Sequence, residues 1–205
     1  EDVLVTPDGR VWTGTADGAL HVHDPATSET TTVTATGGRP LGLENLPDGR
    51  ILVCDAHRGL LALDPATGDL ETLLTEVDGE RLLFCNNAAV TADGTIWFTD
   101  SSRVWPIEEW KNDLIEHTCT GRLFRRTPDG RVTTVIDRLC FANGVALTAA
   151  NVCEVPYDQL STVAAQIPSL QQQLLRVIGQ SVGRDQDHLG ILVRRQANER
   201  IALFL

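Results

Sequence analysis

The sequence predicts a mainly β fold: a partial β-propeller of about three blades over residues 1–149, followed by an α-helical segment over residues 150–205. An Asp-Gly turn between two apolar runs recurs every 40 to 45 residues, in segments 7–14, 47–54 and 92–99. That period suits the four-stranded blades from which propellers are built. The repeat stops near Ala149, and helical signals follow it.

Each repeat is expected to begin as a β-hairpin, because an Asp-Gly turn joins an apolar run to a β-branched run. In the first two repeats a third strand follows and ends on the same turn, Asp-Pro-Ala-Thr, where proline fixes φ and closes the strand. The third and fourth strands of these repeats are expected at 19–23, 30–34, 59–63 and 70–75.

The third repeat carries an insertion at 103–120, which contains Trp105 and Trp110, before its third strand at 121–126. Long insertions of this kind often lie over the end of a scaffold where ligands bind. A further strand at 141–147 is expected to begin a fourth blade. Since blades pack face to face, about half a ring would leave apolar faces and strand edges exposed.

Charge is distributed unevenly along the 205 residues. The net charge is −11, and residues 151–205 hold five Arg and five acidic residues, so the excess negative charge lies before residue 151. An acidic segment repels phosphate backbones and suits a cation, so we expect no nucleic acid as a partner of this chain. The absence of methionine predicts a fragment or a processed piece.

The cysteines show no C-x-x-C pair, so the spacing indicates neither a disulfide framework nor a zinc site. Buried free thiols are the preferred interpretation, which favours a reducing compartment. No run approaches the ~20 apolar residues of a membrane span, and no leader opens the chain, so we expect no membrane contact and a cytoplasmic location. The five are Cys54, Cys85, Cys119, Cys140 and Cys153.

Beyond Ala149, Pro168 suits the first turn of a long helix. Residues spaced alternately three and four apart predict a coiled-coil seam, so we expect a homodimer through helix 169–195. Asp185 within the seam would lie near its own copy and weaken pairing. The alternative is a slightly rotated helix that leaves Asp185 in solvent. The seam consists of Leu175, Ile178, Val182, Asp185, Leu189 and Leu192.

Three motifs carry a resemblance to a known family: Phe-Cys-Asn-Asn-Ala-Ala-Val at 84–90, Trp-Phe-Thr-Asp-Ser-Ser at 97–102, and Phe-Ala-Asn-Gly-Val-Ala at 141–146. Together they resemble the senescence-marker-protein, gluconolactonase and strictosidine-synthase-like propellers, over residues 1 to about 149. The resemblance implies a six-bladed propeller with one divalent cation, usually Ca²⁺, in its central channel.

The resemblance implies that Glu1, Asn86 and Asn143 are ligands of this cation. Calcium takes oxygen ligands at ~2.3 to 2.6 Å and accepts amide carbonyls beside carboxylates. A fourth ligand, an Asp that often acts as the general base, belongs to a later blade of the family and is absent here, so no catalytic residue is assigned. The plainer alternative is that Asn86 and Asn143 cap strand ends by bonding to the backbone.

The resemblance implies that Asn87 binds substrate or water, and His117 and Trp105 are further candidates for substrate binding. Asn87 stands next to the ligand position, and His117 would orient substrate at the mouth of the channel. The alternatives are that His117 is an ordinary surface histidine and that Trp105 and Trp110 pack the insertion against the blades.

The C-terminal part resembles a different family, the fumarate-nitrate reduction regulators. The matching segments are 152–157, 168–170, 185–189 and 197–205. They correspond to the end of the sensor domain, the long dimerisation helix and the start of the next helix. The helix-turn-helix and the N-terminal cysteine cluster are missing, so neither DNA binding nor oxygen sensing is carried over.

Two functions therefore follow from the sequence. The first is a calcium-dependent hydrolase of a small lactone or ester, impaired because the general base is missing. The alternative is a non-catalytic dimeric interaction module, or a fragment of a transcription regulator, that uses helix 169–195.

Overall fold

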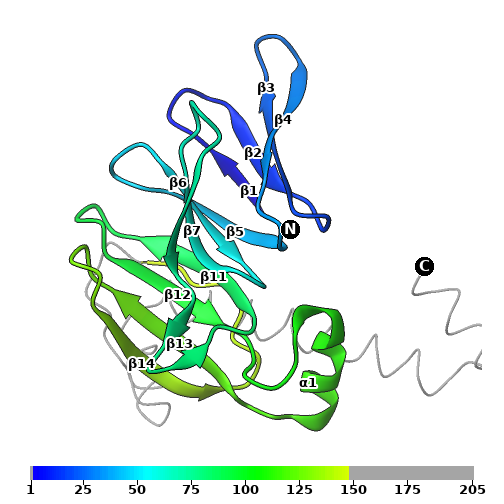
Figure 1. Ribbon diagram of the computed structural model, residues 1–205, viewed down its shortest axis with the longest axis vertical. Helices are drawn as coiled ribbons and strands as arrows, with labels where there is room; N and C mark the ends of the chain where they lie inside the picture. The colour runs from blue at the N-terminus through cyan, green and yellow to red at the C-terminus, as the bar shows by residue number, and fades with distance from the viewer. Residues whose placement is uncertain (1, 148–205) are drawn as a thin grey trace, which may run out of the picture. The chain divides into compact units, whose positions relative to one another are not determined.

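The computed structural model describes residues 2–147, which form three four-stranded antiparallel sheets (Figure 1). In each sheet every strand pairs with the next along the chain, as in a propeller blade. Blade 1 contains β1 (Val3–Val5), β2 (Val11–Gly14), β3 (Ala19–Asp24) and β4 (Glu29–Ala35). Blade 2 contains β5 (Pro40–Asn45), β6 (Ile51–Asp55), β7 (Gly59–Leu63) and β8 (Leu70–Leu74). Blade 3 contains β11 (Cys85–Val90), β12 (Ile96–Asp100), β13 (Gly121–Arg126) and β14 (Val132–Leu139).

Two smaller features join or interrupt the blades. A short hairpin of β9 (Glu76–Val77) and β10 (Glu80–Arg81) lies between blades 2 and 3 in the sequence. The insertion of blade 3 forms a 3₁₀ turn, η1 (Ile107–Glu109), and the helix α1 (Trp110–Glu116). Neither of these helices has the length and apolar character that crossing a bilayer requires, in the part of the chain that is described.

The Asp-Gly turns work as the sequence predicts. In the first turn, Gly9 has φ +84°, a left-handed conformation that favours glycine. Its N–H donates to the carbonyl of Thr6 at 2.8 Å, and the Thr6 hydroxyl donates to Asp8 Oδ1 at 2.6 Å. The turns around Gly94 and Gly130 repeat this arrangement with their own Thr and Asp.

The core lies between the blades, and blade 2 contributes to both halves of it. Leu60 packs in the cluster shared with blade 3, whereas Leu61, the next residue of β7, packs in the cluster shared with blade 1. Successive side chains of a strand point to opposite faces of the sheet, which explains this division. The first strands of the blades adjoin one another, since β5 contacts both β1 and β11.

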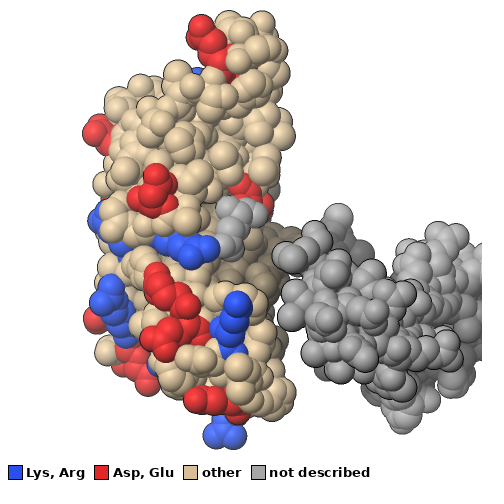
Figure 2. All heavy atoms as spheres, turned by 90° about the vertical axis from the view of Figure 1, so that its right-hand side faces the viewer, with Lys and Arg blue, Asp and Glu red and all other residues tan. Residues whose placement is uncertain are grey.

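Apolar side chains remain exposed on the outer blades. On β1, Val3 and Val5 are 63% and 58% exposed, and on β14, Val135 and Ile136 are each 44% exposed. Charged side chains do not gather by sign on the face in Figure 2, where acidic groups lie beside basic ones.

One expected strand is wrong. Residues 141–147 form no strand, although the repeat predicts the start of a fourth blade there. The first strand of a blade forms its backbone hydrogen bonds with the second strand, and no second strand follows within the described residues. Instead, the carbonyls of Ala142 and Asn143 accept hydrogen bonds from the hydroxyls of Ser101 and Thr99.

The prediction for the cysteines is wrong in part. Cys119 and Cys140 form a disulfide, whereas Cys54 and Cys85 are free and buried as expected. The two bonded residues are 21 positions apart, and they meet because β13 and β14 pair next to them, at Gly121 and Leu139. Tertiary pairing creates this proximity, so the local spacing of cysteines does not reveal it. Cys153 lies outside the described residues, as do Glu1, the seam residues and helix 169–195.

Candidate cation-binding pocket

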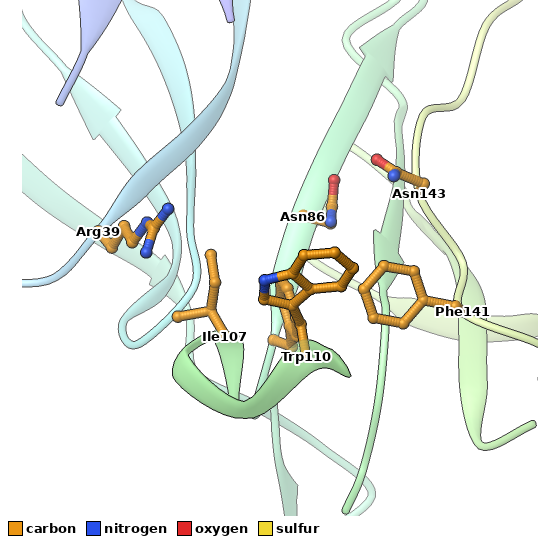
Figure 3. A pocket seen from close by; sticks show the side chains of 7 residues that line it. Arg39, Asn86, Ile107, Trp110, Phe141 and Asn143 are labelled. Carbon is orange, nitrogen blue, oxygen red and sulfur yellow. The ribbon is translucent and has the colours of Figure 1, made fainter. Parts of the chain in front are cut away.

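A pocket of about 260 Å³ opens where β11, the insertion and the segment after β14 meet (Figure 3). It brings together both asparagines that the sequence singles out and several side chains that it does not. The lining residues are Arg39, Phe84, Asn86, Ile107, Trp110, Phe141 and Asn143.

Asn86 enters the pocket because β11 contains a β-bulge. Cys85 pairs with Asp100 and Ala88 pairs with Phe98, so Asn86 and Asn87 together face the single residue Thr99. A bulge of this kind changes the direction of side chains beside functional sites. Gly42 of β5 allows the close approach, since a Cβ there would lie 2.9 Å from the carbonyl of Asn86.

The carboxamide of Asn86 has a defined orientation. Its Nδ2 donates to Ser101 Oγ at 2.9 Å, which leaves Oδ1 as the atom that can bind a cation. Asn143 is held through its backbone, because the Thr99 hydroxyl donates to its carbonyl at 2.6 Å. Figure 3 shows the two carboxamides near each other, beyond the ring of Trp110. Two neutral amide oxygens suit a hard cation such as Ca²⁺.

Aromatic and aliphatic side chains form the other wall of the pocket. Phe141 contacts Phe84 edge to face at 5.6 Å and Trp110 at 6.2 Å between ring centroids. Ile107 is 3% exposed and packs beside Phe84. A contact of 2.9 Å between His57 Nε2 and Glu108 Oε1 ties the insertion to blade 2.

A buried ion pair fixes the start of β11 below the pocket. Asp100 is fully buried and accepts hydrogen bonds from the N–H of Phe84 and from Arg122, both at 2.8 Å. Burial raises the pKa of Asp100, and the hydrogen bond from Arg122 opposes that rise. Arg122 also binds Glu80 at 2.8 Å, so its charge is paired on both sides.

Arg39 lines the pocket without having been predicted from the sequence. In Figure 3 its guanidinium lies across the pocket from Asn143. The internal repeat contains a signal from which the position of Arg39 in its blade can be identified. The N–H of Arg39 donates to Asp55 across 16 residues, and the N–H of Phe84 donates to Asp100 across the same 16. Aligning the blades on these buried aspartates therefore gives Arg39 the blade position of Phe84, a residue that lines the pocket.

Asn87, Trp105 and His117 are not among the residues that line this pocket. The Asn87 backbone N–H donates to Thr99 in the bulge. Trp105 Nε1 donates to Glu116 at 2.9 Å across the insertion. His117 ends α1 with φ +52°, and its Nε2 lies 3.9 Å from the sulfur of Cys140. Trp110 and Ile107 are the residues of the insertion that reach the pocket.

The blades and the amide-lined pocket define a propeller-like protein with a candidate cation site. Residues 11–153 match the family model described as the SMP-30/gluconolactonase/LRE-like region. The chain therefore belongs to this family, as the motifs at 84–90, 97–102 and 141–146 predict.

Two curated relatives are similar in sequence. The adipocyte plasma membrane-associated protein of Salmo salar is 34% identical over 170 residues, which cover 72% of this chain and 41% of the relative. Strictosidine synthase-like protein 6 of Arabidopsis thaliana is 33% identical over 174 residues, covering 78% of this chain and 46% of the relative. The chain thus spans less than half the length of these relatives.

Solved structures show the same fold at lower identity. A gluconolactonase from Xanthomonas campestris is similar with a TM-score of 0.51 and 19% identity, covering 63% of this chain and 44% of that one. Regucalcin, a calcium-binding protein from Agrobacterium tumefaciens, is similar with a TM-score of 0.52 and 20% identity, covering 68% and 43%. The resemblance to transcription regulators concerns residues 150–205, outside the described part, and stays a prediction.

Proposed function

We propose that this chain contributes the cation- and carbonyl-binding side of a lactonase-type site, with Ca²⁺ as the cation and Asn86 and Asn143 among its ligands. The observation that supports the proposal most strongly is that these two asparagines line one pocket although 57 positions separate them in the sequence. The family membership and the calcium-binding relative support the choice of a lactonase-type function and of calcium. We propose Glu1 as a further ligand on the family resemblance alone.

The cation would supply Lewis acidity to the carbonyl of a small lactone or ester. Asn86 and Asn143 would hold it through neutral oxygens, which would leave its charge available to the substrate. Phe84, Trp110 and Phe141 exclude water from one side of the pocket. Arg39 adds a fixed positive charge on the other side, which would orient an electron-rich substrate oxygen.

None of the seven side chains that line this pocket is a carboxylate or an imidazole, so the base that activates water is not among them. We therefore expect Ca²⁺ binding without rapid lactone hydrolysis in this chain. The alternative of a dimeric interaction module is not favoured, because the family match and the pocket both belong to the blades.

The test is thermal unfolding of the chain with Ca²⁺ and with a chelator. A ligand that binds only the folded state raises Tm, by an amount that grows with ligand concentration. The parent is expected to show this rise, and Asn143→Ala is expected to abolish it. Asn45→Ala is the matched control, because Asn45 is likewise an asparagine of the blades but ends β5 and lies in another pocket. Equal melting of the parent with and without Ca²⁺ would contradict the proposal.

A further inference from the structure

Ser101 lies at the centre of a hydrogen-bond network that joins the two asparagines. It directly follows β12 and is fully buried. Its backbone N–H donates to the carbonyl of Phe84 at 2.9 Å. Its hydroxyl contacts Asn86 Nδ2 at 2.9 Å and the carbonyl of Ala142 at 2.5 Å, next to Asn143.

The chemistry of these partners fixes the direction of both hydrogen bonds. A backbone carbonyl can only accept, so the single proton of the Ser101 hydroxyl must point to Ala142. The oxygen of Ser101 then acts as an acceptor towards Asn86. The group that Asn86 turns towards it must therefore be the NH₂ group, and Oδ1 must be directed elsewhere. The donors and acceptors around Asn86 therefore fix the orientation of its amide group.

Thr99 adds a second hydroxyl on the same side of the strand, since residues two apart point the same way. Its Oγ1 donates to the carbonyl of Asn143 at 2.6 Å, and Thr99 as a whole is only 3% exposed. Thr99 holds only the backbone of Asn143, however, whereas Ser101 contacts a side-chain amide of one asparagine and the segment of the other. Only Ser101 therefore links both.

We propose that Ser101 is a positioning residue of the candidate cation site, because its hydroxyl sets the carboxamide orientation of Asn86 and fastens the segment that carries Asn143. The proposal rests on the proposed function. Removing a side chain that orients a metal ligand in this way typically lowers the metal affinity about 10- to 100-fold.

The experiment compares Ser101→Ala with Ser102→Ala in the full 205-residue chain by calorimetric titration with Ca²⁺. Ser102 is the matched control, because it is equally buried and its hydroxyl accepts the N–H groups of Val104 and Trp105. Ser101→Ala is expected to raise the Kd for Ca²⁺ about 10- to 100-fold. Ser102→Ala is expected to leave the Kd unchanged, even if it lowers Tm.

Two further measurements keep the result decisive. Ser101→Cys keeps the buried volume with weaker hydrogen bonds and is expected to give an intermediate Kd, should the Ala variant fail to fold. In an Asn86→Ala background, Ser101→Ala should raise the Kd much less than in the parent. A parent-like Kd for Ser101→Ala, or equal losses in both serine variants, would overturn the inference.

A parent chain that binds no Ca²⁺ would contradict the proposed function, and the role of Ser101 would then be decided in chelator. Thermal unfolding of Asn86→Ala, Ser101→Ala and the double variant forms a double-mutant cycle. Non-additive losses would support the link between the two side chains, and additive losses would overturn it.

Discussion

In the blade turns, a threonine hydroxyl lowers the pKa of a neighbouring aspartate. The hydrogen bond from Thr6 is the largest of several contributions that lower the pKa of Asp8 from 3.8 to about 2, and Arg10 adds to it. Asp17, Asp93 and Asp129 have lowered pKa values for the same reason, each beside its own threonine. These carboxylates are therefore part of the turn and not candidates for acid–base chemistry.

Replacing the threonine should restore an ordinary carboxyl group. Because the folded pKa of Asp8 is lowered, its stabilising contribution is present above pH 3.8 and is lost as the pH falls towards about 2. Thr6→Val is expected to raise the pKa of Asp8 towards 3.8 and to flatten the fall of stability across that window. An NMR titration of the carboxyl carbons measures this directly. Thr15→Val should shift Asp17 and leave Asp8 unchanged; an Asp8 pKa that stays near 2 in Thr6→Val would contradict the assignment.

The residues of the site could be predicted from the sequence only where a motif marks them. Asn86 and Asn143 stand in recurring family motifs, and the structure brings them to one pocket. Ile107 and Trp110 lie in an insertion, where no repeat fixes which side chain turns inward, and the sequence favoured Trp105 over Trp110. Arg39 comes from blade 2 and reaches the pocket only through packing of one blade on the next.

Among the elements, strands bounded by strong turn signals were predicted best. The bounds of β7 (Gly59–Leu63) and β13 (Gly121–Arg126) agree with the sequence to the residue, because glycine begins each and a proline-containing turn follows each. The segment 141–147 has suitable residues but pairs with no strand among the residues that the structure describes. Strand formation there depends on a pairing partner, which local sequence does not specify.

The insertion is the element that the disulfide secures. Cys119 follows α1 and Cys140 precedes Phe141, so the bond fastens the end of the insertion to the segment that lines the pocket. This bond also removes part of the basis for a reducing, cytoplasmic location, which stays a prediction.

The whole sequence contains one lysine, Lys111, and it lies in α1. A lysine-specific protease therefore reports the local opening of this helix, since cleavage needs an unfolded segment. Reduction of the disulfide is expected to increase the cleavage rate several-fold. The control is Cys119→Ser with Cys140→Ser, which should be cleaved rapidly with or without reductant. Equal rates for the oxidised and reduced parent would show that the bond does not hold the insertion.

At the scale of the whole blade assembly, blade 2 is expected to couple the two halves of the core. Leu60 and Leu61 are both fully buried, on opposite faces of β7. Leu60→Ala and Leu61→Ala should each lower the free energy of unfolding by about 2–5 kcal/mol. Urea unfolding followed by circular dichroism and by tryptophan fluorescence should give one coincident transition in each variant.

Ile115→Ala is the control for that experiment, because Ile115 is 81% exposed and its loss should change stability by less than about 0.5 kcal/mol. Separate transitions in the two leucine variants would mean that the blades unfold independently. The order of the strands within each blade followed from the repeat, and the exposed valines of β1 agree with the apolar outer faces that an incomplete ring implies. The β9–β10 hairpin did not follow from the repeat.

The two free thiols among residues 2–147 give the interface between blades 2 and 3 an internal probe. Cys54 and Cys85 are fully buried in the shared core, and the hydrogen bond that the Cys85 thiol shares with Cys54, together with burial, holds the pKa of Cys85 well above its usual range. A thiol in this state does not react with alkylating reagents while the blades are closed. Modification of Cys54 or Cys85 therefore requires the two blades to separate, so their labelling rate reports how readily the protein interior opens to solvent.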